Sequence, residues 1–278
     1  MPNLITSEAQ LRAYIPNIIA SVKGETPLIG RIAHFLDLAE SWVKSTFTGN
    51  ELFISVCNGD LPELHAPLSA LVIADAMRRA IPSLDVMLTP NGFAVVNTSN
   101  LAPASKPRID RLMDSMLAHR DDCIAVVLEA LPKIESWRTT SQAAFFGETL
   151  FQDLRIVDAV GGANDAKWDR YLELRQQVID MEVSLAEEWL SPELMAALRS
   201  QILNGMLTVK RNQLVREVKA QLIGYLRNGS FNSRRLADIV NFIRMNVDDF
   251  KEWHASKTAE LFSPPVFRNT KASKGYFF

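Results

Sequence analysis

The sequence predicts a mainly α-helical protein with two related helical-bundle units in tandem, a β-hairpin inserted in the first unit and an extended C-terminal arm. Three observations predict this fold. Apolar residues recur every three or four positions through most of the chain. The stretch around Trp137 recurs around Trp253, which is typical of a repeated unit. An Asn-Gly dipeptide separates two β-prone runs. We expect the units at residues 1–160 and 161–262 and the arm at 263–278.

Composition excludes several classes of protein. Of the 278 residues, 47% are hydrophobic and 22% charged, the mix of a folded soluble chain. A net charge of -2 gives no bulk attraction to nucleic acid or membrane. The first ten residues lack the features of a secretory signal, and the apolar runs are too short to span a bilayer. Cys57 and Cys123 cannot form a disulfide framework, so we expect both to be reduced.

Local signals place the helices of the first unit. Ser7 and Gln10 have the spacing of a capping box, which opens a short helix reaching Pro16. A helical pattern over residues 28–46 ends at Gly49, and a short apolar run follows at 52–56. We expect a long helix from Pro62 to residue 80, ended by Pro82, and another over residues 106–131.

The clearest local signal is a predicted β-hairpin at residues 85–97. Two β-prone runs flank Asn91-Gly92, a dipeptide that tolerates positive φ at both central turn positions. A lone hairpin is marginal in water, so this one needs a partner surface. Either it folds back on its own helices, or it pairs with a neighbouring subunit. In the second case Asn91 and Gly92 bind the partner.

The second unit follows a linker predicted at residues 160–165. A long helix is expected over residues 166–189. Ser191-Pro192-Glu193 then has the cap-then-proline form of a helix start. Further helices are expected at residues 206–226 and 233–245.

The repeat itself has a constant offset of 116 residues. Four identities occur between the copies: Trp137 with Trp253, Ala143 with Ala259, Phe146 with Phe262, and Phe151 with Phe267. Earlier, residues 49–52 resemble residues 191–194 at an offset of 142. Leu71-Val72 matches Leu214-Val215 at an offset of 143. The first unit therefore carries about 27 additional residues (143 − 116), in the interval that contains the hairpin. The alternative is two unrelated helices that each end in an aromatic anchor.

Catalytic signatures are missing from the sequence. His34, His65, His119 and His254 do not lie at metal-ligand spacing from one another or from a cysteine. His119 lies close to Asp121, Asp122 and Cys123. This group is either a nucleophile pair or metal corner, or an exposed helix surface with one buried thiol. No nucleotide-binding or hydrolase motif occurs. We assign no catalytic, cofactor-binding or metal-binding residue and no cofactor.

The C-terminal arm combines cations with terminal aromatic residues. Aromatic side chains at the tip of such a segment are typical of anchors that fill a pocket. The arm docks either on its own subunit or on another chain, and we favour the second. The partner-binding residues expected in it are Phe267, Arg268, Lys271, Lys274, Tyr276, Phe277 and Phe278.

Four short stretches resemble an uncharacterised family of structural proteins from Bacteroides phages and prophages. They are residues 4–7, 80–96, 102–105 and the ending that runs from Asp248 to Trp253 and from Lys271 to Phe278. The resemblance covers most of the chain. The helical build with a C-terminal arm is also similar to phage head–tail connector (adaptor) proteins, which form rings under the portal.

These resemblances imply a virion protein at the head–tail junction, assembled in the bacterial host cytoplasm, and not an enzyme. The implied partners are further copies of the chain in a ring, dodecameric by family analogy, the portal protein, and tail or neck proteins. DNA would pass through the lumen without sequence-specific binding, and no membrane is involved. Two alternatives remain: an enzyme of unrecognised type using the His119 and Cys123 region, or a helical DNA-packaging or regulatory partner.

Overall fold

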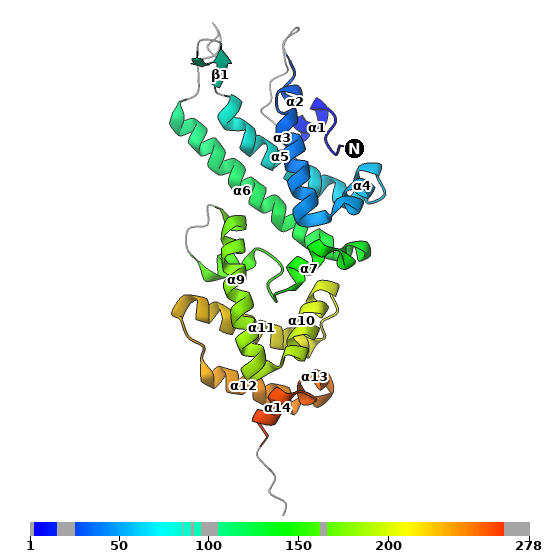
Figure 1. Ribbon diagram of the computed structural model, residues 1–278, viewed down its shortest axis with the longest axis vertical. Helices are drawn as coiled ribbons and strands as arrows, with labels where there is room; N and C mark the ends of the chain where they lie inside the picture. Colours follow the sequence, from blue (N-terminus) through cyan, green and yellow to red (C-terminus); the bar gives the residue numbers. More distant parts are fainter. Residues whose placement is uncertain are drawn as a thin grey trace, which may run out of the picture. The chain divides into compact units, whose positions relative to one another are not determined.

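The structure is a computed structural model that describes residues 3–15, 26–84, 86–89, 92–95, 105–161 and 166–263. The predicted mainly α class is confirmed (Figure 1). The chain forms two compact units, Met1–Gln177 with Gln201–Met206, and Val178–Ser200 with Leu207–Phe278.

Unit 1 contains the following elements. They are α1 Glu8–Tyr14, α2 Leu28–Arg31, α3 Ala33–Val43, the π-helical turn η1 Lys44–Thr48, α4 Asn50–Asn58, α5 Pro62–Leu84, β1 Val86–Thr89, β2 Gly92–Val95, α6 Lys106–Ala130, the 3₁₀ turns η2 Leu131–Lys133 and η3 Glu135–Thr139, α7 Ser141–Gly147, α8 Arg155–Val160 and the first part of α9 Lys167–Leu185.

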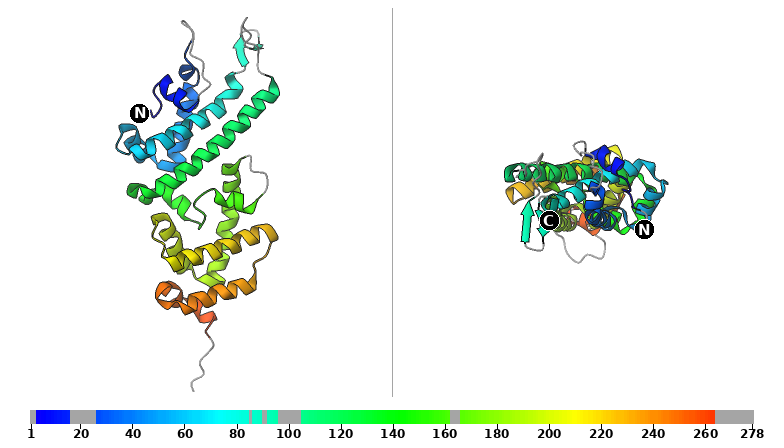
Figure 2. Two further views of the ribbon diagram at one scale, coloured as in Figure 1. Left: turned by 180° about the vertical axis from the view of Figure 1, so that it is seen from behind. Right: turned by 90° about the horizontal axis from the view of Figure 1, so that it is seen from above.

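Helix α5 is central to unit 1. It packs against α3 and α6, and the left view of Figure 2 shows it beside α6. Its side chains from Leu64 to Ile81 are largely buried, including Leu68 and Leu71 at 0% exposure. A helix that is apolar around most of its circumference belongs in the interior. Pro82 does not end this helix as predicted, because residues after a proline can still donate to earlier carbonyls and α5 continues to Leu84.

Strands β1 and β2 occupy the segment in which the sequence predicts a hairpin. They pair antiparallel, with Val86 opposite Val95 and Thr89 opposite Gly92.

The helix starts predicted in unit 1 can be compared with the structure. Ser7 and Gln10 form the expected capping box of α1. The apolar run at 52–56 lies inside α4, a helix that begins directly after Gly49.

Unit 2 contains the end of α9 and the following elements. They are the π-helical turn η4 Ala186–Leu190, α10 Pro192–Asn204, α11 Val209–Asn228, α12 Ser233–Met245, the 3₁₀ turn η5 Val247–Asp249, α13 Lys251–His254 and α14 Lys257–Leu261. Helices α11 and α12 lie side by side (Figure 2). Leu194, Leu214, Leu222, Ile243 and Phe250 form part of its core.

The division between the units differs from the predicted boundary at residues 160 and 161. It falls inside α9, between Gln177 and Val178. The first turns of α9 belong to unit 1 because Trp168 packs on Phe47, with ring centroids 5.1 Å apart, and the Tyr171 hydroxyl donates to the Phe151 carbonyl at 3.0 Å. No glycine or proline occurs between Lys167 and Leu185, so the helix continues past the boundary.

Candidate functional site

The partner-binding residues predicted in the arm all lie outside the described residues, as does Asn91. Gly92 is described as the first residue of β2, opposite Thr89. The described part of the second unit ends at Ser263, directly after Phe262, whose ring lies 5.6 Å from that of Trp189. The arm predictions therefore stay predictions.

Trp137, Phe47 and Phe146 form an aromatic anchor in unit 1. The indole Nε1 of Trp137 donates to the carbonyl of Phe47 at 2.6 Å, across 90 residues of sequence. Phe47 stacks on Phe146 at 6.1 Å, and Trp137 and Phe146 are each 1% exposed. Thr140 caps the start of α7 by accepting from Ala143 N. The anchor therefore ties η3 and α7 to the π-helical turn η1.

Trp253, Trp189 and Phe262 form a second aromatic anchor, in unit 2. The indole Nε1 of Trp253 donates to the carbonyl of Trp189 at 2.9 Å. The rings of Phe262 and Trp253 lie 6.1 Å apart. Ser256 caps α14 by accepting from Ala259 N. This anchor ties α13 and α14 to the π-helical turn η4.

In each unit the residue that follows the π-helical turn has a positive φ, and this residue is called the corner. Gly49, after η1, has φ 75 and ψ 169. Ser191, after η4, has φ 69 and ψ 142 and is the one residue other than glycine with positive φ among the described residues. Such dihedrals are strained for a residue with a Cβ. Ser191 is also fully buried, and its hydroxyl accepts from Leu194 N at 3.2 Å.

Buried charges in unit 1 are paired within helices or with backbone. The carboxylate of Asp75, with 0% exposure, accepts from Arg78 at 3.0 Å and Arg79 at 2.5 Å. Glu40 accepts from Leu4 N at 2.8 Å, which ties the N-terminal segment to α3. Burial raises the pKa of Glu40, and the hydrogen bond from Leu4 opposes that rise.

Buried charges in unit 2 are paired in the same manner. Glu182 of α9 is fully buried and accepts from Arg199 Nε of α10 at 2.9 Å. Arg211 of α11 donates to both oxygens of Glu252, at 2.8 and 2.7 Å, and to the Asp249 carbonyl. Burial raises the pKa of Glu252, but hydrogen bonds, chiefly from Arg211, outweigh it and lower the pKa overall.

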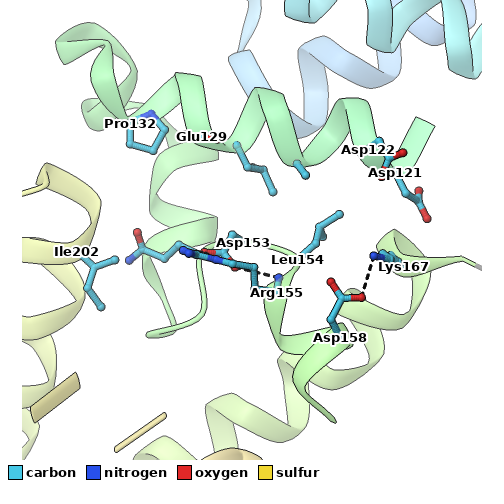
Figure 3. A pocket seen from close by; sticks show the side chains of 13 residues that line it. Asp121, Asp122, Glu129, Pro132, Asp153, Leu154, Arg155, Asp158, Lys167 and Ile202 are labelled. Carbon is cyan, nitrogen blue, oxygen red and sulfur yellow. Dashed lines mark hydrogen bonds and ion pairs between the residues drawn. The ribbon is translucent and has the colours of Figure 1, made fainter. Parts of the chain in front are cut away.

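An open pocket of about 440 Å³ in unit 1 gathers charged side chains (Figure 3). It lies beside α6, α8 and the start of α9. Lys167 contacts Asp158 at 2.8 Å, and Arg155 contacts Asp153. The hydrogen bond with Asp158 raises the pKa of Lys167. Each of these two cations therefore neutralises one carboxylate of the pocket.

Asp121, at the edge of that pocket, is 2% exposed and serves a structural purpose. One of its oxygens accepts from Arg120 at 2.8 Å, and the other accepts from the backbone N of Trp168 at 3.3 Å. The second bond satisfies an N–H near the start of α9. Within the described ranges, no group of three or more His, Cys, Asp or Glu residues is arranged to hold a metal ion.

His119 and Cys123 do lie together on α6. The Cys123 Sγ is 3.8 Å from His119 Nε2. Burial, with a contribution from Asp122, raises the pKa of the Cys123 thiol to about 11. A cysteine nucleophile reacts as the thiolate, and its pKa is low at catalytic sites. The pair therefore fits the interpretation of a buried structural thiol. Cys57 and Cys123 are both free, as expected.

A groove of about 410 Å³ lies between α11 and α12 of unit 2. Sequence reasoning missed it. Its apolar floor consists of Leu214, Ile239 and Phe242, and its charged rim consists of Glu217, Asp238 and Arg235. Neither carboxylate of the rim makes an ion pair with another described residue.

In the part of the chain that the structure describes, no helix has the length and apolarity to cross a membrane.

Comparison with known proteins gives one match. Residues 26–147 match a family of unknown function, DUF6712. The match covers less than half of the chain and ends with the last residue of α7, so it includes Phe47, Trp137 and Phe146 of the first anchor. No curated protein and no solved structure matches the chain.

Proposed function

We propose that this protein is a structural component of a bacteriophage virion, a head–tail connector (adaptor) whose copies form a ring at the portal–tail junction. The stretches that resemble phage structural proteins support the proposal, as does the mainly helical build. The partners proposed are further copies of the chain, in a dodecamer, the portal protein, and tail or neck proteins. The protein would be assembled in the host cytoplasm.

The use of buried charge carries the proposal. Every charged side chain that is buried among the described residues has a hydrogen-bonding or ionic partner that fixes a helix or a chain segment, as Asp75, Glu182 and Arg211 illustrate. Paired interior charges suit a protein whose task is to hold a shape.

The two units are, in this proposal, related copies, with the β-hairpin inserted in the first. The matching anchors support it: Trp137 donates to Phe47, and Trp253 donates to Trp189. Both acceptors belong to a π-helical turn that is followed by a positive-φ corner and a new helix. Unrelated helices would have no reason to share this sequence of features.

The proposed mechanism is geometric. Identical copies associate through unlike surfaces, and a rotation that closes produces a ring. The arm of each copy reaches a neighbour or the portal, and many weak contacts around the ring add to a strong attachment. A net charge of -2 lets DNA pass, because strong binding of duplex DNA needs many cations against its phosphates.

A mass measurement tests this function. The purified chain is measured by mass photometry alone and after mixing with the portal protein of the phage that encodes it. A connector forms a ring-sized species or joins the portal. A protein that stays a monomer or dimer in both samples, at micromolar concentration and physiological salt, is not a connector.

A further inference from the structure

The groove between α11 and α12 continues into exposed apolar surface at one end. Val209, 88% exposed, precedes Gln213 and Glu217 of the groove by one and two helical turns. Met245, 84% exposed, lies three residues after Phe242 on α12. The N-terminal end of α11 lies near the chain that follows α12, because Lys210 and Arg211 both bind Asp249. The two exposed apolar side chains therefore extend the same end of the groove.

The rim gives the groove a preference for cations. It carries two carboxylates, Glu217 and Asp238, and one cation, Arg235. Glu217 is half-buried and Asp238 is exposed, and neither is neutralised by an ion pair in the described chain. A fitting ligand thus has aromatic or aliphatic groups for the floor and positive charges for the rim. At about 410 Å³, the groove is within the range of roughly 300–1,000 Å³ that holds ligands.

The chain itself contains a segment with this chemistry. Residues 264–278 hold no acidic side chain, three cations at Arg268, Lys271 and Lys274, and aromatic residues at positions 267 and 276–278. We propose that residues 264–278 of one copy dock in the α11–α12 groove of a second copy. This inference rests on the proposed function, since it names the surface through which neighbours in the ring join.

Charge and composition argue for this occupant over an unrelated partner. Apolar residues at the tip meet the floor and the apolar end near Val209 and Met245, and the cations meet Glu217 and Asp238. Each copy has one such segment and one groove, so the contact is head-to-tail and can close into a ring. Docking of the segment on its own groove would leave nothing to join the copies, and the experiment separates these cases.

The experiment uses two variants with complementary defects. The first is the chain shortened to residues 1–263, which keeps the groove and lacks the segment. The second is the full chain with Glu217→Lys and Asp238→Lys, which keeps the segment and reverses the rim. Both changes are at helix positions with solvent access, and circular dichroism checks the fold. Asp114→Lys, an exposed carboxylate of α6 in unit 1, is the matched control for charge.

Analytical ultracentrifugation of the variants, separate and mixed, is the readout. We expect neither variant to self-associate and the equimolar mixture to form a 1:1 heterodimer, because it retains one intact segment and one intact groove. The heterodimer should weaken as salt rises. A synthetic peptide of residues 264–278 should bind the shortened chain, and the double reversal in the shortened chain should reduce that affinity by about tenfold or more. Asp114→Lys should change neither result.

Three results would overturn the inference. Normal assembly of the rim variant means that the segment docks elsewhere. Assembly of the shortened chain means that the segment does not join the copies. If that assembly is a ring, the connector proposal is still supported. Peptide binding to the shortened chain, without heterodimer formation in the mixture, means docking within one chain. A heterodimer together with a full chain that never exceeds a dimer and never joins the portal would support the docking and reject the connector.

Discussion

Ser191 and Gly49 have the same backbone role with different side chains. Each follows a π-helical turn with φ near 70 and leads into a helix. At position 49 a Cβ would lie 3.0 Å from Gln142 Oε1 and adopt a strained φ. At position 191 the Cβ is present, and the capping bond to Leu194 N offsets part of the strain.

The positive φ at the two corner residues predicts opposite effects on stability for Gly49→Ala and Ser191→Gly. Gly49→Ala should lower the free energy of unfolding by about 1–3 kcal/mol, because the new Cβ is strained and crowded. Ser191→Gly should leave it unchanged or raise it by up to about 1 kcal/mol, since relief of strain exceeds the small cost of replacing a cap by glycine. Urea denaturation of both variants measures this. A clear loss of stability in Ser191→Gly would show that the hydroxyl outweighs the strain.

Cys123 gives a prediction that depends on pH. Its pKa is raised from 9.0 to about 11, so the folded state holds the proton more tightly than the unfolded state. Its contribution to stability is therefore complete below pH 9 and is lost as pH rises towards 11. We expect slow alkylation of Cys123 by iodoacetamide at pH 7.5 in the native protein, and normal assembly when Cys57 and Cys123 are both replaced by Ala. Fast alkylation at pH 7.5 would revive the nucleophile alternative.

At the scale of elements, the two aromatic anchors are the most informative comparison. Each joins a late 3₁₀ or α-helical turn to the carbonyl of a π-helical turn far earlier in the chain, Phe47 in unit 1 and Trp189 in unit 2. An indole replaced by phenyl keeps the apolar ring and removes the single N–H donor.

Trp137→Phe and Trp253→Phe should therefore each destabilise the unit that contains the substitution. A buried carbonyl loses its partner, at a cost of about 1–3 kcal/mol. Hydrogen exchange measured by mass spectrometry on the full chain should show faster exchange near residues 44–52 in the first variant and near residues 186–194 in the second. The two variants control for each other. If one of them exchanges as the wild type does, the anchors are not equivalent.

Local chemistry made several elements predictable. The Ser7–Gln10 capping box, the helix from residue 106 and the start of α10 at Pro192 were all visible as short-range patterns. Likewise, aromatic spacing pointed to Trp137 and Trp253. The carbonyls that receive their hydrogen bonds could not be predicted, because a pairing across 64 or 90 residues leaves no local signal in one sequence.

Neither the unit boundary nor the groove could be predicted from the sequence, because both depend on tertiary contacts. A predicted linker at residues 160–165 gave a natural place for a boundary, but α9 continues past it, and tertiary contacts of Trp168 and Tyr171 decide to which unit its first turns belong. The α11–α12 groove depends on which faces of two helices meet. Helical periodicity identifies apolar faces, but it does not determine the space left between them.

On the scale of the whole molecule, the C-terminal segment is the part on which assembly depends in this account. Ordering a chain costs roughly 1–2 kcal/mol per residue, and each large apolar side chain that is buried returns about 1.5–3 kcal/mol. Aromatic residues at positions 276–278 would offset part of that cost only if a surface receives them.

Removal of residues 264–278 should leave a folded protein that no longer assembles. The aromatic anchor of unit 2 ends at Phe262 and remains complete, so circular dichroism and the unfolding midpoint should change little. Sedimentation should show loss of the large species. Unfolding of the shortened chain would mean that the segment packs on its own subunit.

Cryo-electron microscopy of the purified full chain tests the central claim most directly. We expect closed rings with a central channel, in which every copy contacts the next through the same pair of unlike surfaces. Particles that are only monomers or two-fold dimers, with or without the portal protein, would contradict it.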